Sequence, residues 1–413
     1  MIYGCIGEHL SHSYSAEIHR LIGNEPYELK EIEPENLGSF LREGDFCAVN
    51  VTIPYKEAVI PYLAEMSPTA RAVGAVNTII RHGDGTLSGY NTDVWGLTAL
   101  FRHAGIDPAG RKALILGTGG TSKTALYTLR GLGAREIIRV SRSGREGAVT
   151  YEEALEKHRD AEIIVNATPC GMYPEPEGMP LDPDAFPALR GVADAIYNPL
   201  RSRLILRARA RGIPAEGGLY MLAAQAVKAA ELFRGRTYPG EMTEDIYRRV
   251  LRGRENAVLI GMPGSGKSSA AAALARRLGR EWADTDSLIV RKTGMEITEI
   301  FRRFGEARFR ELESHVIRDL SCRTGLVIAT GGGAVLKKEN LEALRRNGRL
   351  FLLDRPLGEL LPTSDRPLAD SEEKLLRLYR ERMPLYRAAA DEIISTGRSP
   401  EETAQTMESR WNA

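Results

Sequence analysis

The sequence predicts an α/β protein built from parallel sheets, and three observations support this fold class. Short apolar runs alternate with helical patterns along most of the chain, which is typical of strands joined by helices that cover both faces of a sheet. Two glycine-rich turns, GTGG at residues 117–120 and GMPGSGKSS at residues 261–269, each follow a strand pattern and precede a helical pattern. The 413 residues exceed the needs of one ordinary core, so we expect two or three domains.

The expected strands form two groups, separated by a charged segment with a helical pattern. The first group is KALIL (112–116), EIIRV (136–140), AEIIVNAT (161–168) and GVADAIYN (191–198), and the second is AVLI (257–260), GLVIAT (325–330) and RLFLLD (349–354). The charged segment ends near Gly253 and leaves only a very short connection to the second group. We therefore divide the chain into residues 1–252 and residues 253–413.

Composition excludes several classes of partner. The 56 basic and 55 acidic residues give a net charge of +1, which provides no electrostatic basis for binding nucleic acid or an anionic membrane. The four cysteines are scattered, which argues against a zinc site or a disulfide framework, and we expect them to be small buried side chains. The first residues do not resemble a signal peptide, and no apolar run approaches the roughly 18 residues of a membrane span. These features predict a cytoplasmic protein whose partners are small molecules.

The first glycine-rich turn is typical of a dinucleotide-binding site. Gly117 would allow the tight turn, and Gly119 and Gly120 would let backbone approach a pyrophosphate at the helix N-terminus. Ser122 stands at the third glycine position, so an ordinary strand-to-helix turn is the alternative. At the end of the next strand come Ser141 and Arg142, where an NAD enzyme would carry an acidic residue. An arginine suits a 2′-phosphate, which predicts NADP as the cofactor.

The second glycine-rich turn predicts a P-loop. Backbone N–H groups of residues 263–268 would surround a β-phosphate, the Lys267 ammonium would bridge β- and γ-phosphate oxygens, and the Ser268 hydroxyl would bind Mg²⁺. Many kinases and NTPases share this loop, so the loop alone indicates a nucleotide and no particular acceptor. The candidate ATP-binding residues are Gly264, Ser265, Gly266, Lys267, Ser268 and Ser269.

Further segments of the first part resemble the shikimate dehydrogenase family, in the family's order. These segments are HSYSAEIH (12–19), NVTIPYK (50–56), GAVNT (74–78), GYNTDVWG (89–96), NATPCGM (166–172), DAIYNPL (194–200) and GGLYMLAAQ (217–225). The resemblance covers roughly residues 1–250. It implies reduction of 3-dehydroshikimate to shikimate, a substrate domain of about residues 1–97 plus the C-terminal helices, and an NADP-binding Rossmann domain of about residues 98–222.

The resemblance also assigns roles to individual residues. Reduction of a ketone leaves an alkoxide that must be protonated, and Lys56 would supply the proton while Asp93 orients the lysine and holds a substrate hydroxyl. Ser13 and Ser15 alternate in what we expect to be an extended segment, so both can point at the substrate carboxylate. A local cap or turn is the alternative role for any single serine or asparagine. Further expected contacts are Thr52, Asn77, Asn91, Tyr197 and Gln225 for substrate, and Asn166, Thr168, Gly218 and Met221 for NADP.

Segments of the second part resemble the shikimate kinase family. They are GMPGSGKSS (261–269), ADTDSLI (283–289), FGEARFRELE (304–313), ATGGGAV (329–335), SDRPL (364–368) and RMPLY (382–386). The resemblance implies ATP-dependent phosphorylation of the 3-hydroxyl of shikimate. Another small-molecule kinase, such as a gluconate kinase, is the alternative.

The kinase-like motifs supply the groups that phosphoryl transfer requires. Asp284 would bind the shell of a magnesium ion, and Asp286, expected on the same strand face, would hold and deprotonate the attacking hydroxyl. Arg366 lies in a polar, proline-containing segment that we expect to be a mobile lid, and it would close over the transferred phosphoryl group. Guanidinium groups suit a substrate carboxylate, and glycines allow backbone to approach the ring. The residues expected in those roles are Arg310, Arg382, Gly331, Gly332 and Gly333.

The sequence therefore predicts two consecutive reactions on one chain, with NADP(H), ATP and Mg²⁺ as cofactors. One alternative is a regulatory protein that binds the same ligands without chemistry. The presence of Lys56, Asp93, Lys267, Ser268 and Asp286 argues against this alternative. The other alternative is a dehydrogenase of broader scope, acting on quinate with NAD, fused to a kinase.

Overall fold

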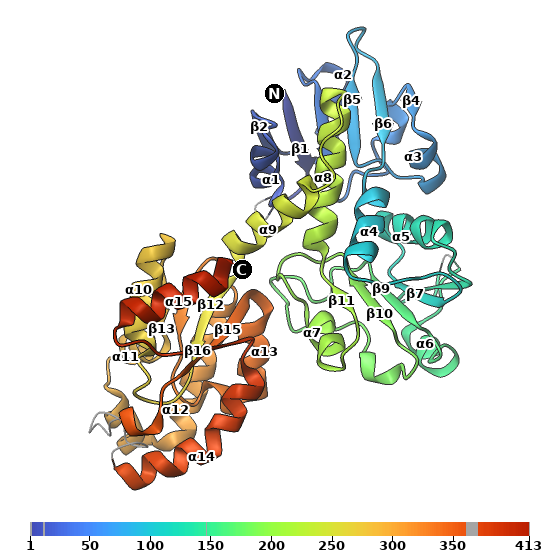
Figure 1. Cartoon of the computed structure of the whole chain (residues 1–413). Helices are drawn as coiled ribbons and strands as arrows, with labels where there is room; N and C mark the ends of the chain where they lie inside the picture. Colours follow the sequence, from blue (N-terminus) through green and yellow to red (C-terminus); the bar gives the residue numbers. More distant parts are fainter. Residues whose placement is uncertain (1, 11–12, 146, 361–370, 413) are drawn as a thin grey trace. The chain divides into compact units, whose positions relative to one another are not determined.

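The computed structural model describes residues 2–10, 13–145, 147–360 and 371–412 (Figure 1). The chain divides into two compact units, Met1–Leu251 and Arg252–Ala413. The division falls inside helix α9 (Met242–Arg254), one residue before the position expected from the sequence. Each unit has its own sheets and its own apolar clusters, and the fold class is the predicted α/β.

The first sheet of the first unit has six strands and mixed direction. Its strand order is β2-β1-β3-β5-β6-β4, and β5 runs antiparallel to both of its neighbours. The remaining pairings in this sheet are parallel. The elements are β1 Tyr3–Gly7, α1 Ser15–Ile22, β2 Tyr27–Glu31, α2 Leu37–Glu43, β3 Ala48–Val51, β4 Glu65–Met66, α3 Pro68–Val73, β5 Thr78–Arg81 and β6 Leu87–Tyr90.

The second sheet of this unit is the parallel sheet that the sequence predicts. Its five strands have the order β11-β10-β9-β7-β8, with β9 in the centre, and all pairs are parallel. All five residues of β7, which lies between β9 and β8, are buried, as expected for an interior strand that is covered on both faces. The elements are α4 Asp93–His103, β7 Lys112–Leu116, α5 Gly120–Gly131, β8 Glu136–Val140, α6 Tyr151–Lys157, β9 Ile163–Asn166, β10 Gly191–Asp194, α7 Arg203–Ala210, β11 Ala215–Glu216 and α8 Gly218–Arg234.

Helices α4 and α8 join the two sheets of the first unit (Figure 1). Met221 of α8 packs in the cluster beneath β7, whereas Leu219 and Ala223 pack with α1 on the other side. A Cβ placed at Gly96 of α4 would lie 2.6 Å from the Met221 carbonyl oxygen. The close approach of the two helices therefore requires glycine at this position.

The second unit is a single five-stranded parallel sheet between layers of helices. The strand order is β13-β14-β12-β15-β16. Alternate residues of the central strand enter different apolar clusters, Val258 and Ile260 on one face and Ala257 and Leu259 on the other. The elements are β12 Asn256–Ile260, α10 Lys267–Leu278, β13 Trp282–Asp284, α11 Thr285–Thr293, α12 Ile297–Ser321, β14 Val327–Ala329, α13 Lys338–Asn347, β15 Gly348–Asp354, α14 Glu372–Ala389, β16 Glu392–Ser395 and α15 Pro400–Asn412.

Helix α9 leads directly into the second unit. Its residues Ile246 and Val250 are buried in an apolar cluster of the first unit. Its last carbonyl, of Arg254, accepts a hydrogen bond from the N–H of Gly325 at 2.8 Å. A single residue, Glu255, separates the helix from β12.

Two general expectations can be compared with the described residues. The expectation of buried cysteines is wrong for Cys47 and Cys322, which are exposed, and holds for Cys5. Among the described residues, every helix is too short or too polar to cross a membrane.

Candidate active sites

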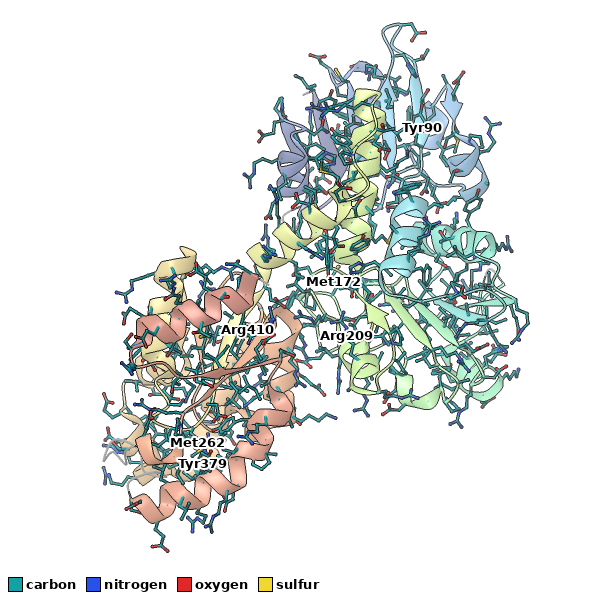
Figure 2. All side chains as sticks on the ribbon, in the orientation of Figure 1. Tyr90, Met172, Arg209, Met262, Tyr379 and Arg410 are labelled. Atoms are coloured by element: carbon teal, nitrogen blue, oxygen red, sulfur yellow. The ribbon has the colours of Figure 1, made fainter. Side chains whose placement is uncertain are left out.

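The first candidate site is a pocket of about 540 Å³ in the first unit. Its wall comes from the loops after β1 and β3, the starts of α4 and α8, and the loops after β9 and β10. Met172, labelled in Figure 2, belongs to the loop after β9. The carboxyl ends of parallel strands are the usual place for a ligand in such a sheet. The predicted residues that line the pocket are Ser13, Ser15, Thr52, Lys56, Asn77, Asp93, Thr168, Tyr197, Gly218, Met221 and Gln225.

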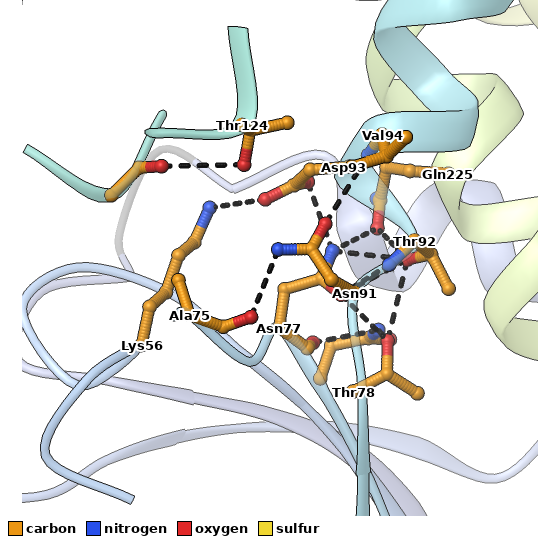
Figure 3. Close-up of polar contacts among 12 residues, drawn as sticks. Lys56, Ala75, Asn77, Thr78, Asn91, Thr92, Asp93, Val94, Thr124 and Gln225 are labelled. Atoms are coloured by element: carbon orange, nitrogen blue, oxygen red, sulfur yellow. Dashed lines mark hydrogen bonds and ion pairs between the residues drawn. The ribbon is translucent and has the colours of Figure 1, made fainter. Parts of the chain in front are cut away.

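Lys56 and Asp93 form an ion pair at the wall of this pocket (Figure 3). Lys56 Nζ donates to Asp93 Oδ2 at 2.6 Å, and the two side chains are 16% and 8% exposed. Asp93 is the first residue of α4, where the positive end of the helix dipole favours a carboxylate. The pair thus presents an ammonium group that can polarise a carbonyl oxygen and then protonate it.

Asn77 holds the second oxygen of Asp93. Its Nδ2 donates to Asp93 Oδ1 at 2.9 Å, while its Oδ1 accepts from the backbone N–H of Thr92 at 2.7 Å. The Thr92 hydroxyl in turn donates to Gln225 Oε1 at 3.3 Å (Figure 3). Residues from β5, α4 and α8 are therefore joined in one hydrogen-bond network beside the pocket.

Asn91, a predicted substrate contact, makes local hydrogen bonds instead. Its Oδ1 accepts from the N–H of Val94 at 3.2 Å, and its Nδ2 donates to the Ala75 carbonyl at 3.0 Å. The residue does not line the pocket. Its side chain satisfies an otherwise unpaired N–H group at the start of α4, which is a common task for asparagine.

Ser13 and Ser15 lie together at the pocket, but the predicted extended segment is wrong. Ser15 begins helix α1, and the preceding residue, Tyr14, has φ −88° and ψ 0°. Ser13 Oγ donates to Ser15 Oγ at 3.1 Å and accepts from the Ser15 N–H at 3.2 Å. A turn at the start of a helix, rather than strand alternation, brings the two hydroxyls together.

The glycine-rich turn after β7 lies beside Lys56. Gly117 has φ +108°, a backbone conformation that glycine adopts readily. A Cβ at Gly120, the first residue of α5, would lie 3.7 Å from Lys56 Cδ, and one at Gly119 would have no atom within 4 Å in the part of the chain that the structure describes. Ser122, at the third position of the motif, donates from Oγ to the Gly117 carbonyl at 2.6 Å and so closes the turn. The open N-terminus of α5 can therefore receive a phosphate group next to the Lys56–Asp93 pair.

Asn166 lies beneath the pocket rather than in its wall. Its Oδ1 accepts from both the N–H and the hydroxyl of Thr168, at 3.1 and 2.7 Å. Its Nδ2 donates to Asp194 at 3.0 Å, and the Ser202 hydroxyl donates to the same carboxylate at 2.5 Å. Burial raises the pKa of Asp194 to about 7. Asn166 thus fixes the loop that carries Thr168. Asp194, which had no predicted role, in turn fixes Asn166.

Ser141 and Arg142 lie at the carboxyl end of β8. Ser141 Oγ accepts from the Gly144 N–H at 3.1 Å and so shapes the turn that follows the strand. Arg142 is exposed. Neither residue lines the 540 Å³ pocket, whose wall includes the loops after β9 and β10 but not the loop after β8.

The second candidate site is a pocket of about 240 Å³ in the second unit. It is formed by the P-loop, the end of β13, the first turn of α11, one face of α12, the turn after β14, and α14. Ser265 does not line it, and Arg366 lies outside the described residues. The predicted residues that line it are Gly264, Gly266, Lys267, Ser268, Ser269, Asp284, Asp286, Arg310, Gly331, Gly332, Gly333 and Arg382.

The P-loop encloses the amino group of Lys267. Lys267 Nζ donates to the carbonyls of Gly261 and Met262 at 2.9 and 2.8 Å. Gly264 and Gly266 have φ of +82° and +87°, which lets the loop turn its backbone toward the pocket. The buried Ser265 hydroxyl has no hydrogen-bond partner among the described residues, and it lies within the same loop.

Two aspartates stand at the junction of β13 and α11. Ser268 Oγ donates to Asp284 Oδ2 at 2.5 Å, and Asp284 Oδ1 caps α11 by accepting from the Ser287 N–H at 3.0 Å. The expectation that Asp286 shares a strand face with Asp284 is wrong, because β13 ends at Asp284 and Asp286 lies in the first helical turn. Burial, reinforced by the charges of Asp284 and Glu313, raises the pKa of Asp286 to about 6.

Arg310 is held by two glutamates on its own helix. Its Nη1 donates to Glu313 at 2.8 Å and its Nη2 to Glu306 at 2.9 Å. Glu313 is fully buried, burial raises its pKa, and its Oε1 has no partner among the described residues. Glu313 is a site residue without a predicted role, although its spacing of three residues from Arg310 on a helix was a usable signal. Arg382, from α14, donates to the Gly332 carbonyl at 3.1 Å.

Comparison with known proteins identifies the first unit. A shikimate dehydrogenase from Clostridium beijerinckii is 36% identical over 262 residues, which are 59% of this chain and 96% of the relative. The chain belongs to the shikimate dehydrogenase family. The family model for the shikimate dehydrogenase substrate-binding domain matches residues 5–79.

Solved shikimate dehydrogenases have the same fold as the first unit. The enzyme from Peptoclostridium difficile is 36% identical, with a TM-score of 0.56, and the alignment covers 60% of this chain and 97% of that one. The enzyme from Thermus thermophilus, solved with NADP(H) and shikimate, is 33% identical, with a TM-score of 0.54 and coverage of 60% and 99%.

The remainder of the chain matches a second family. The shikimate kinase model matches residues 263–411, which include Lys267 and most of the P-loop, Asp286, Arg310 and Arg382. The second unit therefore contains a shikimate kinase domain joined to a shikimate dehydrogenase.

Proposed function

We propose that this shikimate dehydrogenase also phosphorylates its product, so that one chain reduces 3-dehydroshikimate to shikimate with NADPH and converts shikimate to shikimate 3-phosphate with ATP. One observation carries the proposal. Each unit assembles a set of charged groups in its own pocket, the Lys56–Asp93 pair at 2.6 Å in one and the P-loop lysine with Asp286 in the other. Neither set borrows a residue from the other unit.

The residues of the first pocket suit a polyhydroxylated ring acid. The adjacent hydroxyls of Ser13 and Ser15 can donate to a carboxylate, and Tyr197 can add a third hydroxyl. Lys56 then faces the ring carbonyl, where its ammonium stabilises the developing alkoxide and gives it a proton. Asp93 orients Lys56 and can accept a hydrogen bond from a neighbouring ring hydroxyl. The further proposed contacts to the ring hydroxyls are Thr52, Asn77 and Gln225.

The first unit also has a suitable place for NADP. A bound NADPH would supply the hydride. The open N-terminus of α5 at Gly119 and Gly120 fits a pyrophosphate, and exposed Arg142 at the end of β8 fits a 2′-phosphate. Thr168, Gly218 and Met221 are the proposed contacts on the pocket side.

The second pocket fits ATP and Mg²⁺. The positive φ angles of Gly264 and Gly266 open the loop for phosphate, and the buried Ser265 hydroxyl lacks a partner among the described residues. No group of three or more metal-binding side chains occurs in the described part of the chain. The Ser268 hydroxyl and the Asp284 carboxylate nevertheless suit Mg²⁺, which usually takes only one or two protein oxygens and completes its shell with water and phosphate. A bound magnesium ion would neutralise phosphate charge there.

The remaining groups of the second pocket suit the acceptor. Asp286, with its raised pKa, can accept the proton of the attacking hydroxyl. Arg310 and Arg382 can bind the carboxylate, and the glycines at 331–333 leave room for the ring. Arg366, outside the described residues, remains the proposed group that covers the transferred phosphoryl group.

A substrate and cofactor panel on the purified chain tests the proposal. We expect reduction of 3-dehydroshikimate with NADPH and phosphorylation of shikimate with ATP. Lys56→Ala should abolish most of the reduction, leave NADPH binding nearly unchanged and leave phosphorylation intact, because Lys56 acts on the substrate carbonyl. Lys267→Ala should abolish most of the phosphorylation and leave the reduction intact. Turnover of quinate with NAD, or binding of shikimate without either reaction, would contradict the proposal.

A further inference from the structure

A row of buried polar side chains lies in the mixed sheet beside the first pocket, and one member of the row, Asn50, lines that pocket. Asn50 of β3 and Thr78 of β5 are direct partners in the antiparallel register, so their side chains share one face of the sheet. Asn50 is 6% exposed and Thr78 is fully buried. Buried polar groups in folded proteins are nearly always hydrogen-bonded, and the side chains of this row bond to one another.

The hydrogen bonds at Asn50 have a defined direction. Asn50 Oδ1 accepts from the Tyr27 hydroxyl at 2.8 Å, and Asn50 Nδ2 donates to the Asn77 carbonyl at 3.4 Å. This orients Asn50 Nδ2 toward Thr78 Oγ1, which is 3.2 Å away. Because an amide nitrogen only donates, the Thr78 hydroxyl accepts there and directs its own hydrogen elsewhere.

The Thr78 hydroxyl acts on the amide of Asn77. Thr78 Oγ1 donates to Asn77 Oδ1 at 3.1 Å, and the backbone N–H of Thr92 donates to the same oxygen at 2.7 Å. Asn77 Nδ2 therefore faces Asp93 Oδ1, at 2.9 Å (Figure 3). A reversed amide would place Nδ2 against the Thr92 N–H and Oδ1 against a carboxylate, which are two repulsive contacts.

We propose that Thr78 is a positioning residue for the reduction, and that Tyr27 and Asn50 keep its hydroxyl directed at Asn77. Thr78 does not line the pocket, so it acts through Asn77 and Asp93 on the Lys56 ammonium. Without the hydroxyl, the Asn77 amide and then Asp93 can rotate away from the geometry that holds Lys56 at the substrate. Proton transfer depends steeply on such geometry. The inference rests on the proposed reduction of 3-dehydroshikimate.

Two substitutions at Thr78 separate the hydroxyl from the shape of the side chain. Thr78→Val keeps the shape and removes the hydroxyl, whereas Thr78→Ser keeps the hydroxyl. Thr128→Val is the matched control, because Thr128 is 3% exposed on α5 and its hydroxyl has no partner among the described residues. We expect Thr78→Val to lower kcat for reduction roughly tenfold, with the KM for NADPH and the phosphorylation of shikimate unchanged. Thr78→Ser should recover most of kcat, and Thr128→Val should resemble the wild type.

Tyr27→Phe tests the far end of the row without altering a fully buried residue. It removes the hydroxyl that orients Asn50 and keeps the ring, which stacks on His19 with centroids 3.9 Å apart. We expect a smaller loss of kcat, about twofold to threefold, because the Thr92 N–H still holds Asn77. If Thr78→Val does not fold, this variant decides the question.

Three results would overturn the inference. One is a Thr78→Val enzyme with reduced melting temperature and wild-type kcat, which would make the hydroxyl purely structural. Another is a Thr78→Ser enzyme as slow as Thr78→Val, which would assign the effect to the lost methyl group. The third is wild-type kcat in Tyr27→Phe when Thr78→Val does not fold. Failure of the proposed function itself would differ from all three, since the wild-type chain would then not reduce 3-dehydroshikimate.

Discussion

Gly333 lies against the guanidinium of Arg310, so one added methyl group gives a sharp test of the second site. A Cβ at this position would lie 1.9 Å from Nη1, 2.2 Å from Cζ and 2.4 Å from Nη2 of Arg310. Comfortable contact between such atoms requires about 3.5 Å. The backbone of Gly333, with φ −104° and ψ −2°, accepts alanine without strain. In Gly333→Ala the guanidinium must therefore move by roughly 1.5 Å.

This displacement should weaken shikimate binding by a large factor. It breaks the 2.8 Å hydrogen bond to Glu313 and moves Arg310 away from the proposed position of the substrate carboxylate. One hydrogen bond to a charged group is worth about 1.5–3 kcal/mol. The KM for shikimate should then rise roughly tenfold to a hundredfold. The KM for ATP should change little, because neither Gly333 nor Arg310 belongs to the P-loop.

The assay measures ADP release while shikimate is titrated at saturating ATP. Gly358→Ala is the control, because a Cβ at Gly358 would meet no atom of the described residues within 4 Å. Reduction of 3-dehydroshikimate by the same preparation reports that the first unit is intact. A KM for shikimate within threefold of the wild-type value in folded Gly333→Ala would refute the role of Arg310 as a carboxylate ligand.

Three other predictions concern cofactor choice, pH and the joining of the two units. Arg142→Ala should lower the preference for NADPH over NADH roughly tenfold to a hundredfold, because a charge-assisted contact to the 2′-phosphate is lost; an unchanged ratio of kcat/KM values would contradict this. The kinase kcat should fall as the pH drops through about 6, because Asp286 must be deprotonated to act as a base and its pKa is raised to about 6; a flat profile from pH 7 to pH 5 would rule out this role. An equal mixture of Lys56→Ala and Lys267→Ala chains should form shikimate 3-phosphate with the same lag as an equal number of wild-type sites, since each pocket draws its residues from one unit. A markedly longer lag in the mixture would show direct transfer of shikimate within the wild-type chain.

The sequence predicts the parallel sheets well because their strands are strongly apolar. KALIL reads as a buried strand, and all five of its residues are buried in β7. The mixed sheet could not be derived in the same way. Its strand β4 has only two residues, Glu65 and Met66, and its strand β2 is mostly exposed, so neither carries a strong apolar pattern.

The local conformations of some site residues also could not be predicted from spacing. Alternation suggested a strand for Ser13–Ser15 and for Asp284–Asp286, but in both cases a helix begins within the pair. A polar residue at a helix start is hard to distinguish from one on a strand, because both patterns place hydroxyls or carboxylates two residues apart. Glu313 was overlooked because the segment FGEARFRELE resembles a solvated helix, and only packing against the pocket makes it fully buried.

Helix α9 constrains how the two activities can be separated genetically. Its side chains Ile246 and Val250 complete an apolar cluster of the first unit, while its Arg254 carbonyl accepts a hydrogen bond from Gly325 in the second. A gene cut after residue 241 would deprive the dehydrogenase fragment of those apolar side chains, and a cut after residue 254 would deprive the kinase fragment of that carbonyl. A cut after residue 251, where the two units divide, would leave Ile246 and Val250 with the first fragment and Arg254 with the second, so the suitable position lies inside the helix.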